Sequence, residues 1–313
     1  MGYRHINNLY KDTDILLFKE CYALEKIHGT SAHITFKWQI YSGIPVPELS
    51  FFSGGASHVT FKALFNESDL LSQLSKVIPH DKEITIYGEA YGGKEQGMSH
   101  TYGKQLKFIV FDVQIGDCWL NVPDAEAFVK PLGLEFVHYV RVSTDLKALD
   151  AERDACSVQS VRNGVTTHED FIAGKGKPRE GIVLRPIKEM TLNNGHQVVS
   201  KHKGAAFSET ASPRQVEVDP AKLAKLAEAG AIATEWCTLT RLAHVLDKIP
   251  DHCMEKMPII LEAMLEDVLR EGAGEIDLTQ NEQGIKKTIK STTAKLYQQF
   301  LKQKLVDSQT TPA

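Results

Sequence analysis

Residues 25–30 read Glu-Lys-Ile-His-Gly-Thr, so Lys26 stands two residues ahead of a polar turn residue and three ahead of a glycine. A lysine presented on a tight turn in this way is typical of a nucleophile. A match of this length also arises by chance, and an ordinary solvated surface lysine is the alternative interpretation. The prediction therefore depends on the stretches that follow along the chain.

Four further short stretches follow Lys26 in order. They are Tyr87-Gly88-Glu89, Phe108-Ile109-Val110-Phe111-Asp112, Glu180-Gly181-Ile182-Val183-Leu184-Arg185 and Val199-Ser200-Lys201-His202-Lys203-Gly204. With residues 25–30 they resemble motifs I, III, IIIa, IV and V of the covalent nucleotidyltransferases, the superfamily of ATP-dependent ligases and mRNA capping enzymes. The form of the first motif is similar to that of the RNA ligase 2 family, the nick-sealing branch that repairs RNA. The resemblance covers roughly residues 20 to 205 and is specific, because five motifs occur in the right order.

The pattern of residue types along the sequence predicts an α+β fold with two domains. Between residues 30 and 205, short β-branched or aromatic runs alternate with Gly, Pro and Asn, which is typical of antiparallel sheets. The expected strands are 32–36, 59–61, 83–87, 107–113, 181–186 and 197–201. After Pro213, apolar residues recur every three or four positions in segments rich in Ala, Leu, Glu and Lys, which predicts helices over 220–246, 257–270 and 282–305. We expect an antiparallel-sheet nucleotidyltransferase (adenylation) domain over 1–212 and a smaller all-helical domain over 213–313.

Composition limits the other classes of function. The 313 residues include 36 Lys and Arg against 40 Asp and Glu, so the net charge of −4 excludes wholesale coating of nucleic acid and leaves a local patch. The stretch 170–205, with seven basic and three acidic residues, is the most basic part of the chain. The five cysteines have no spacing that indicates disulfides or zinc. We expect a cytoplasmic protein, because neither a signal peptide nor a membrane-spanning run is found.

A lysine nucleophile must lose its proton, and neighbouring cations favour the neutral amine. Lys201 and Lys203 can supply these cations. In a strand they would point to one face while His202 points to the other. An exposed strand edge protected by lysines is the alternative. With a triphosphate in the same cleft, Lys201 and Lys203 would also bind the α-phosphate and its developing charge.

The resemblance implies three displacements at phosphorus, which need a divalent cation held by carboxylates. Lys26 would attack the α-phosphorus of ATP, AMP would pass from the lysine to an RNA 5′-phosphate, and a 3′-hydroxyl would displace it. Glu180 matches the motif IV glutamate and is the first choice for a metal ligand. Asp112 would orient either a basic partner or a metal-bound water, and it is the second choice for a metal ligand. We expect Mg²⁺, with Mn²⁺ able to substitute.

The resemblance also implies a set of nucleotide contacts. Glu89 matches the glutamate that approaches the ribose, and Phe111 matches the aromatic residue that stacks on adenine, although its pattern alone favours a core position. Glu25 would accept a hydrogen bond from the adenine amino group and so favour ATP over GTP. Ile27 and His28 are assigned to the same site.

Two departures from the family pattern matter. Ser31 replaces the usual asparagine and removes an amide expected near the metal-bound water. No arginine occurs from residue 5 to residue 140, so the arginine expected to contact the adenylate between motifs I and III is missing. Lys37 and Lys62 are the candidates to replace it.

We therefore predict an ATP-dependent RNA ligase that acts on RNA ends, in a nicked duplex or a structured RNA, as a monomer without membrane attachment. Two alternatives stay open. One is a compact ATP-dependent DNA ligase or a ligase for DNA-splinted substrates. The other is a catalytically silent protein that binds nucleic-acid ends, against which the intact Lys26, Glu180, Lys201 and Lys203 argue.

Overall fold

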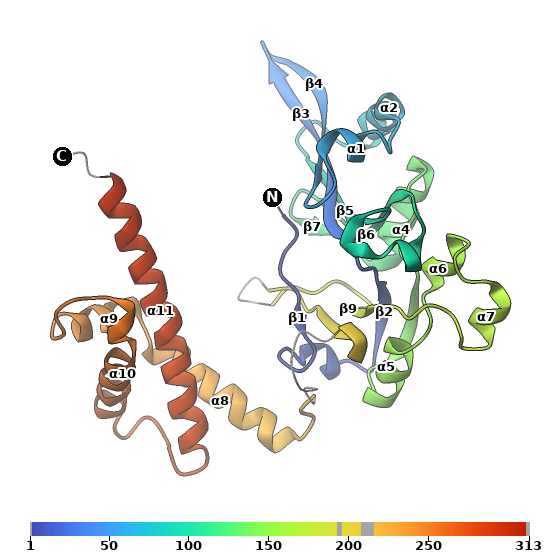
Figure 1. The fold of residues 1–313 in the computed structure, drawn as a ribbon. Coiled ribbons are helices and arrows are strands. Elements are labelled where there is room, and N and C mark those ends of the chain that lie inside the picture. The colour runs from blue at the N-terminus through green and yellow to red at the C-terminus, as the bar shows by residue number, and fades with distance from the viewer. Residues whose placement is uncertain (1, 193–195, 208–215, 311–313) are drawn as a thin grey trace. The chain divides into compact units, whose positions relative to one another are not determined.

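The computed structural model describes residues 2–192, 196–207 and 216–310, and the chain divides into a first unit, residues 1–216, and a second unit, residues 217–313 (Figure 1). The first unit combines two β-sheets with short helices, whereas the described residues of the second form helices. The predicted α+β class, with antiparallel sheets followed by a helical region, is confirmed.

The first sheet has the strand order β1-β10-β9-β2-β8. Its strands are β1 Asn7–Asn8, β2 Glu20–Lys26, β8 Tyr139–Ser143, β9 Gly181–Pro186 and β10 Ser200–Lys203. The pair β1 and β10 is parallel, and the other pairs are antiparallel. The order brings both ends of the unit into one sheet, because β1 and β2 come from its start and β9 and β10 from its end.

The second sheet has the order β4-β3-β5-β6-β7 and is antiparallel throughout. Its strands are β3 Thr30–Tyr41, β4 Ile44–Ser53, β5 Ile84–Gly92, β6 Leu106–Ile115 and β7 Cys118–Trp119. Strand β5 pairs with β3 only from Thr30 to Phe36, so the rest of the β3–β4 hairpin projects beyond the sheet (Figure 1).

Short helices connect and cover the strands. They are α1 His58–Lys62, α2 Glu67–Val77, α3 Ser99–Tyr102, α4 Val122–Val129, α5 Leu146–Arg153, α6 Val158–Arg162 and α7 His168–Ile172. The predicted strand at 59–61 is wrong, because these residues lie in α1. The Ser57 side chain accepts a hydrogen bond from the backbone N–H of Thr60, and this N-cap outweighs the strand propensity of Val59 and Thr60. The strand predicted at 197–201 begins three residues later in the structure, because β10 spans Ser200–Lys203.

Strand β2 is buried on both faces, which fixes its position in the first unit. Leu24 packs in a core that includes Ile34 and Ile86 of the second sheet. On the other face, Cys21 and Ala23 pack in a separate core with residues of β9, α5 and the 3₁₀ helix Asp14–Leu17. Strand β2 ends at Lys26, so the predicted nucleophile stands at the end of a strand that is held from two sides.

The second unit contains α8 Pro220–Trp236, α9 Leu239–Leu246, α10 Met257–Glu271 and α11 Glu282–Thr310. The helix predicted over 220–246 is broken at Cys237, since the Thr238 side chain caps a new helix by accepting the Arg241 N–H. The four helices share their own apolar core. No helix in the described ranges is long and apolar enough to span a membrane.

Gly181 should be intolerant of a side chain. Its φ is +151°, and a Cβ atom would lie 2.2 Å from the His202 carbonyl oxygen on β10. We predict that Gly181→Ala lowers the free energy of unfolding by about 2 kcal/mol or more, measured by denaturant titration. Gly164→Ala is the matched control, because Gly164 also has a positive φ, +72°, but a Cβ there meets nothing within 4 Å. Equal losses in the two variants would contradict a steric cause.

Candidate active site

Strand register places the predicted nucleophile beside residues from the other end of the unit. Lys26 on β2 is paired with Gly181 on β9, and Gly181 is paired with Lys203 on β10. Glu180 directly precedes Gly181 and therefore lies between the two lysines. Three of the predicted site residues, far apart in the sequence, are brought together by hydrogen bonding between three neighbouring strands.

The Glu180 carboxylate is the centre of this cluster. Its Oε2 accepts a hydrogen bond from Lys26 Nζ at 2.9 Å and lies 3.1 Å from His28 Nδ1, and its Oε1 lies 3.0 Å from Lys203 Nζ. The side chain is only 2% exposed. Burial alone would raise the pKa of Glu180, but the charges and hydrogen bonds of Lys26 and Lys203 outweigh burial and lower it. Glu180 is therefore held as a carboxylate.

A close backbone approach explains the glycine after His28. A Cβ on Gly29 would lie 2.3 Å from the Ala90 carbonyl oxygen on β5. Without a side chain, Gly29 can donate its N–H to Glu89 Oε1 at 3.1 Å. Burial, together with the Glu180 charge, raises the pKa of Glu89 to about 7, although Lys26 and the Gly29 N–H oppose the shift. Glu89 thus stands near the cluster as an acid that titrates close to neutral pH.

A cavity of about 350 Å³ opens beside the cluster, a size suited to a small-molecule ligand. Its apolar wall comes from strands of both sheets and from Ile6, Ile27 and Val137. Among the predicted site residues, the cavity is lined by Glu25, Lys26, Ile27, Glu89, Phe111 and Lys201. Glu180 and Lys203 are not among its lining residues, but Glu180 contacts Lys26 and Lys203 contacts Glu180. Phe111 is half-buried, and its ring lies edge-on to Tyr3 with centroids 4.9 Å apart.

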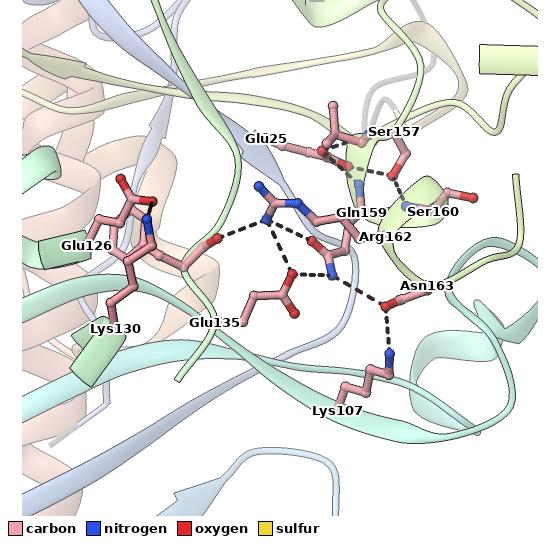
Figure 2. Close-up of polar contacts among 12 residues, drawn as sticks. Glu25, Lys107, Glu126, Lys130, Glu135, Ser157, Gln159, Ser160, Arg162 and Asn163 are labelled. Atoms are coloured by element: carbon pink, nitrogen blue, oxygen red, sulfur yellow. Dashed lines mark hydrogen bonds and ion pairs between the residues drawn. The ribbon is translucent and has the colours of Figure 1, made fainter. Parts of the chain in front are cut away.

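Glu25 occupies a different environment from the one expected. Its carboxylate is buried and accepts hydrogen bonds from the Ser157 hydroxyl at 2.5 Å and from the backbone N–H groups of Val158 and Gln159 (Figure 2). Glu25 therefore caps the N-terminus of α6. The side chain of Gln159 continues the network to Glu135 (Figure 2). The adenine contact stays a prediction, and both Glu25 oxygens are already used within the protein.

Asp112 has protein partners in this structure, and its role as a metal ligand stays a prediction. The Asp112 side chain has no exposed surface, its Oδ1 lies 2.9 Å from the Arg185 guanidinium, and its Oδ2 accepts the Tyr3 hydroxyl at 2.7 Å. The backbone N–H of Val113 also donates to Oδ1. With both oxygens used, Asp112 orients a basic partner, which was the other expectation for it. The pKa of Arg185 is raised by Asp112 and Glu189 despite the opposing effect of burial.

The described residues offer few side chains that could together bind a divalent cation. No group of three His, Cys, Asp or Glu side chains that could hold a metal is found among the described residues. Glu180 is the carboxylate next to Lys26 at the cavity, and Mg²⁺ in nucleotide sites is bound through one or two carboxylates, with waters and substrate phosphates completing its shell. Both Glu180 oxygens already contact Lys26, His28 and Lys203, so a bound ion would have to displace one of these contacts.

The missing arginine is not replaced by the expected lysines. Lys37 pairs with Glu48 at 3.6 Å and Lys62 with Glu67 at 2.8 Å, both on the surface. Ser31 does line the cavity.

Two arginines line the cavity instead: Arg4 from the N-terminal segment and Arg185 from β9. The Arg4 guanidinium lies over the Trp119 ring at 4.3 Å. No local pattern marks Tyr3 or Arg4 as site residues, because only the tertiary fold brings them to the cavity. Arg185 stands within the motif IV stretch and could have been considered from the sequence.

The alternation along β10 separates its two predicted cations from the histidine between them. Lys203 points to Glu180 and Lys201 lines the cavity. His202 Nε2 lies instead 2.7 Å from Asp150 Oδ1 on α5. Both lysine side chains therefore lie on the face of the sheet that carries the candidate site.

A family model described as RNA ligase matches residues 19–203, which is more than half of the chain and contains this whole cluster. The chain belongs to the RNA ligase family. The resemblance drawn from the five motifs is confirmed at the level of the family. No curated protein matched the chain.

Solved structures of an RNA ligase from Naegleria gruberi are similar to this family member. The form with pyrophosphate has a TM-score of 0.45 and 13% identity, over 66% of this chain and 57% of that one. A variant with ATP and Mn has a TM-score of 0.44 and 13% identity, over 66% and 56%. An apo variant has a TM-score of 0.44 and 14% identity, over the same shares. The match therefore spans little more than half the length of the Naegleria protein.

Asp112→Asn should destabilise the fold rather than weaken metal binding. It would leave the buried Arg185 with less charge compensation, and breaking a buried ion pair costs about 3 kcal/mol or more. We expect a lower melting temperature by the same amount in EDTA and in magnesium. A variant that melts like the wild type in EDTA but loses stabilisation by magnesium would return Asp112 to the metal site.

Glu89 should make stability depend on pH. Its folded pKa, about 7, lies above the ordinary value of 4.5, so the folded state binds this proton more tightly than the unfolded state does. The stability from Glu89 is greatest below pH 4.5 and falls as the pH rises to about 7. We predict that Glu89→Gln melts higher than wild type at pH 8, by a margin that shrinks at pH 5.5. An equal margin at both pH values would contradict the raised pKa.

Proposed function

We propose that this chain is an ATP-dependent RNA ligase that joins 3′-hydroxyl and 5′-phosphate ends through a lysyl-AMP and an RNA-adenylate. The observation that carries the proposal is the hydrogen bond between Lys26 and the buried Glu180 at the edge of the cavity, within a member of the RNA ligase family. The cluster supplies a candidate nucleophile, a proton acceptor and cations in one place.

In the first step, the Lys26 nitrogen forms a bond to the α-phosphorus of ATP, and the bond from that phosphorus to the departing pyrophosphate breaks. Lys26 must give up a proton, and Glu180 Oε2 at 2.9 Å is placed to accept it. Strand β2, buried on both faces, holds the lysine in position. Positioning of this kind dominates catalysis of phosphoryl and nucleotidyl transfer.

The remaining site residues are assigned by their places around the cavity. Lys201 and Lys203 approach from β10 and would neutralise charge on the α-phosphate. Phe111 on the cavity wall would stack on adenine, and Glu89 would contact the ribose. His28, which lies beside Glu180, and Ile27, which lines the cavity, would complete the nucleotide site.

ATP and a divalent cation are the proposed substrate and cofactor. The Naegleria gruberi RNA ligase was solved with ATP and Mn, which is in keeping with this choice. A bound Mg²⁺ or Mn²⁺ would neutralise phosphate charge, and Glu180 is the residue that would hold it. Glu180 would then both accept the proton of Lys26 and bind the cation.

The proposed partners are RNA ends in a nicked duplex or structured RNA, in keeping with a role in RNA repair. A monomer suffices for this chemistry, because the cluster is built from one chain. Sealing of nicks in every combination of RNA and DNA strands would identify which strand must be RNA. A preference for all-DNA nicks would favour the DNA ligase alternative.

Wild-type protein mixed with magnesium and α-labelled ATP should acquire a covalent AMP label, and Lys26→Ala should acquire none. Lys37→Ala is the matched control, because Lys37 lies on the surface of β3 and pairs with Glu48. The label should be released by acid and hydroxylamine, as a phosphoramidate is. Full labelling of Lys26→Ala would refute the assigned nucleophile, and an acid-stable label would indicate a serine or threonine ester.

A further inference from the structure

Helix α11 concentrates positive charge in a unit that is acidic as a whole. Residues 217–313 contain fifteen Asp and Glu against twelve Lys and Arg. Residues 283–306 within α11 nevertheless contain six lysines and no acidic residue. Charge of one sign is thus collected on one helix, which is the pattern of an electrostatic binding surface.

Five of the six lysines of α11 fall into two groups by their contacts. The sixth, Lys304, is exposed but lies on another face, about 200° around the helix from Lys302. Lys286 Nζ donates to Glu282 Oε1 at 2.6 Å, and Lys290 pairs with Glu262 of α10, so these two are compensated within the unit. Lys287, Lys295 and Lys302 are exposed, and within the described ranges no ion pair is found for them. We call these three residues the lysine stripe.

The lysine stripe lies on one face of α11, opposite the face that packs in the core. Ile285, Ile289 and Tyr297 are fully buried on the core side. Lys287, Lys295 and Lys302 are eight and seven residues apart, so at 100° per residue they point within about 80° of one another. At 1.5 Å per residue they are spaced by about 12 and about 10 Å. Ser291 and Gln298 lie between them and are exposed.

We propose that the lysine stripe is the surface through which the second unit binds the phosphate backbone of RNA. This inference rests on the proposed function, since it supplies the RNA contact that the ligation of ends requires. A row of uncompensated ammonium groups about 10 Å apart suits a polyanion with regularly repeated charges, and ammonium groups contact phosphates without reading the base sequence.

A membrane surface fits α11 less well than RNA does. A helix that lies on a bilayer inserts its apolar face among the lipids. The apolar face of α11 is already used, because Ile285, Ile289 and Tyr297 are buried in the core of the second unit. The exposed face around the lysine stripe carries polar residues at 291 and 298 instead.

The test compares two full-length triple variants with the same change in charge. The first replaces the lysine stripe by Lys287→Gln, Lys295→Gln and Lys302→Gln. The control replaces three lysines of the same unit outside α11. These substitutions are Lys225→Gln, Lys248→Gln and Lys256→Gln. Lys and Gln have similar helix propensity, so both variants should melt near the wild-type temperature.

Binding to a 5′-phosphorylated nicked RNA duplex is measured by fluorescence anisotropy over a series of salt concentrations. The stripe variant should bind about tenfold or more weakly at low salt, and its slope of log K against log salt should fall by about 2 to 3. The control variant should keep the wild-type slope. Both should form the covalent AMP label at the wild-type rate, since the labelling residues lie in the first unit.

Three results would overturn the proposal. They are a wild-type slope in the stripe variant, equal losses in the two variants, and stripe-dependent binding to phosphatidylserine vesicles without stripe-dependent binding to RNA. Failure of the proposed function has a different signature. It would appear as no AMP label in the wild-type protein, whatever the slopes of the RNA titrations.

Discussion

A single buried carboxylate organises the first unit's cluster. Glu180 lies where three strands meet and contacts Lys26 and Lys203 together with His28. The ammonium groups of Lys26 and Lys203 both contact this carboxylate, and without an anion between them they would repel each other and push β2 and β10 apart. The same carboxylate is deeply buried, so it depends on those cations in turn. The arrangement holds Lys26, the proposed nucleophile, beside Glu180, the proposed acceptor of its proton, and close to the positive charge of Lys203.

A second buried ion pair, between Asp112 and Arg185, has a supporting role. It links β6 of the second sheet to β9 of the first, and the Tyr3 hydroxyl joins it from the N-terminal segment. The two carboxylates predicted as metal ligands thus have different partners in the structure. Glu180 contacts Lys26, and Asp112 joins the two sheets through Arg185. Neutralisation by Arg185 explains how an aspartate with no exposed surface is tolerated there.

The sequence predicted what depends on local pattern, and missed what depends on tertiary contacts. The strands predicted at 83–87, 107–113 and 181–186 from their β-branched and aromatic runs correspond to β5, β6 and β9, and the helices after Pro220 follow from their periodicity. The segment 59–61 has the same composition as a strand, but the Ser57 cap makes it a helix. Strand alternation was enough to separate Lys203 from His202.

The partners of buried charges could not be predicted from spacing. Glu25 caps α6, which begins more than 130 residues later, and Asp112 meets a tyrosine at the third position of the chain. Nothing in the residues around either carboxylate indicates these contacts. A motif identifies which side chains carry chemistry, whereas the fold decides which of them are already engaged.

The order of strands in the first sheet has a consequence for synthesis on the ribosome. Lys26 and Glu180 are 154 residues apart in the sequence, and β1 pairs with β10 across nearly the whole unit. Contacts of such high sequence separation form late, because a long loop must close before they contribute. A nascent chain that has exposed residues 1–180 has every residue of the nucleophile turn and lacks β10. Lys26 therefore meets Glu180 and Lys203 only after residue 203 has left the exit tunnel, so a chain that stalls before this point lacks the assembled cluster.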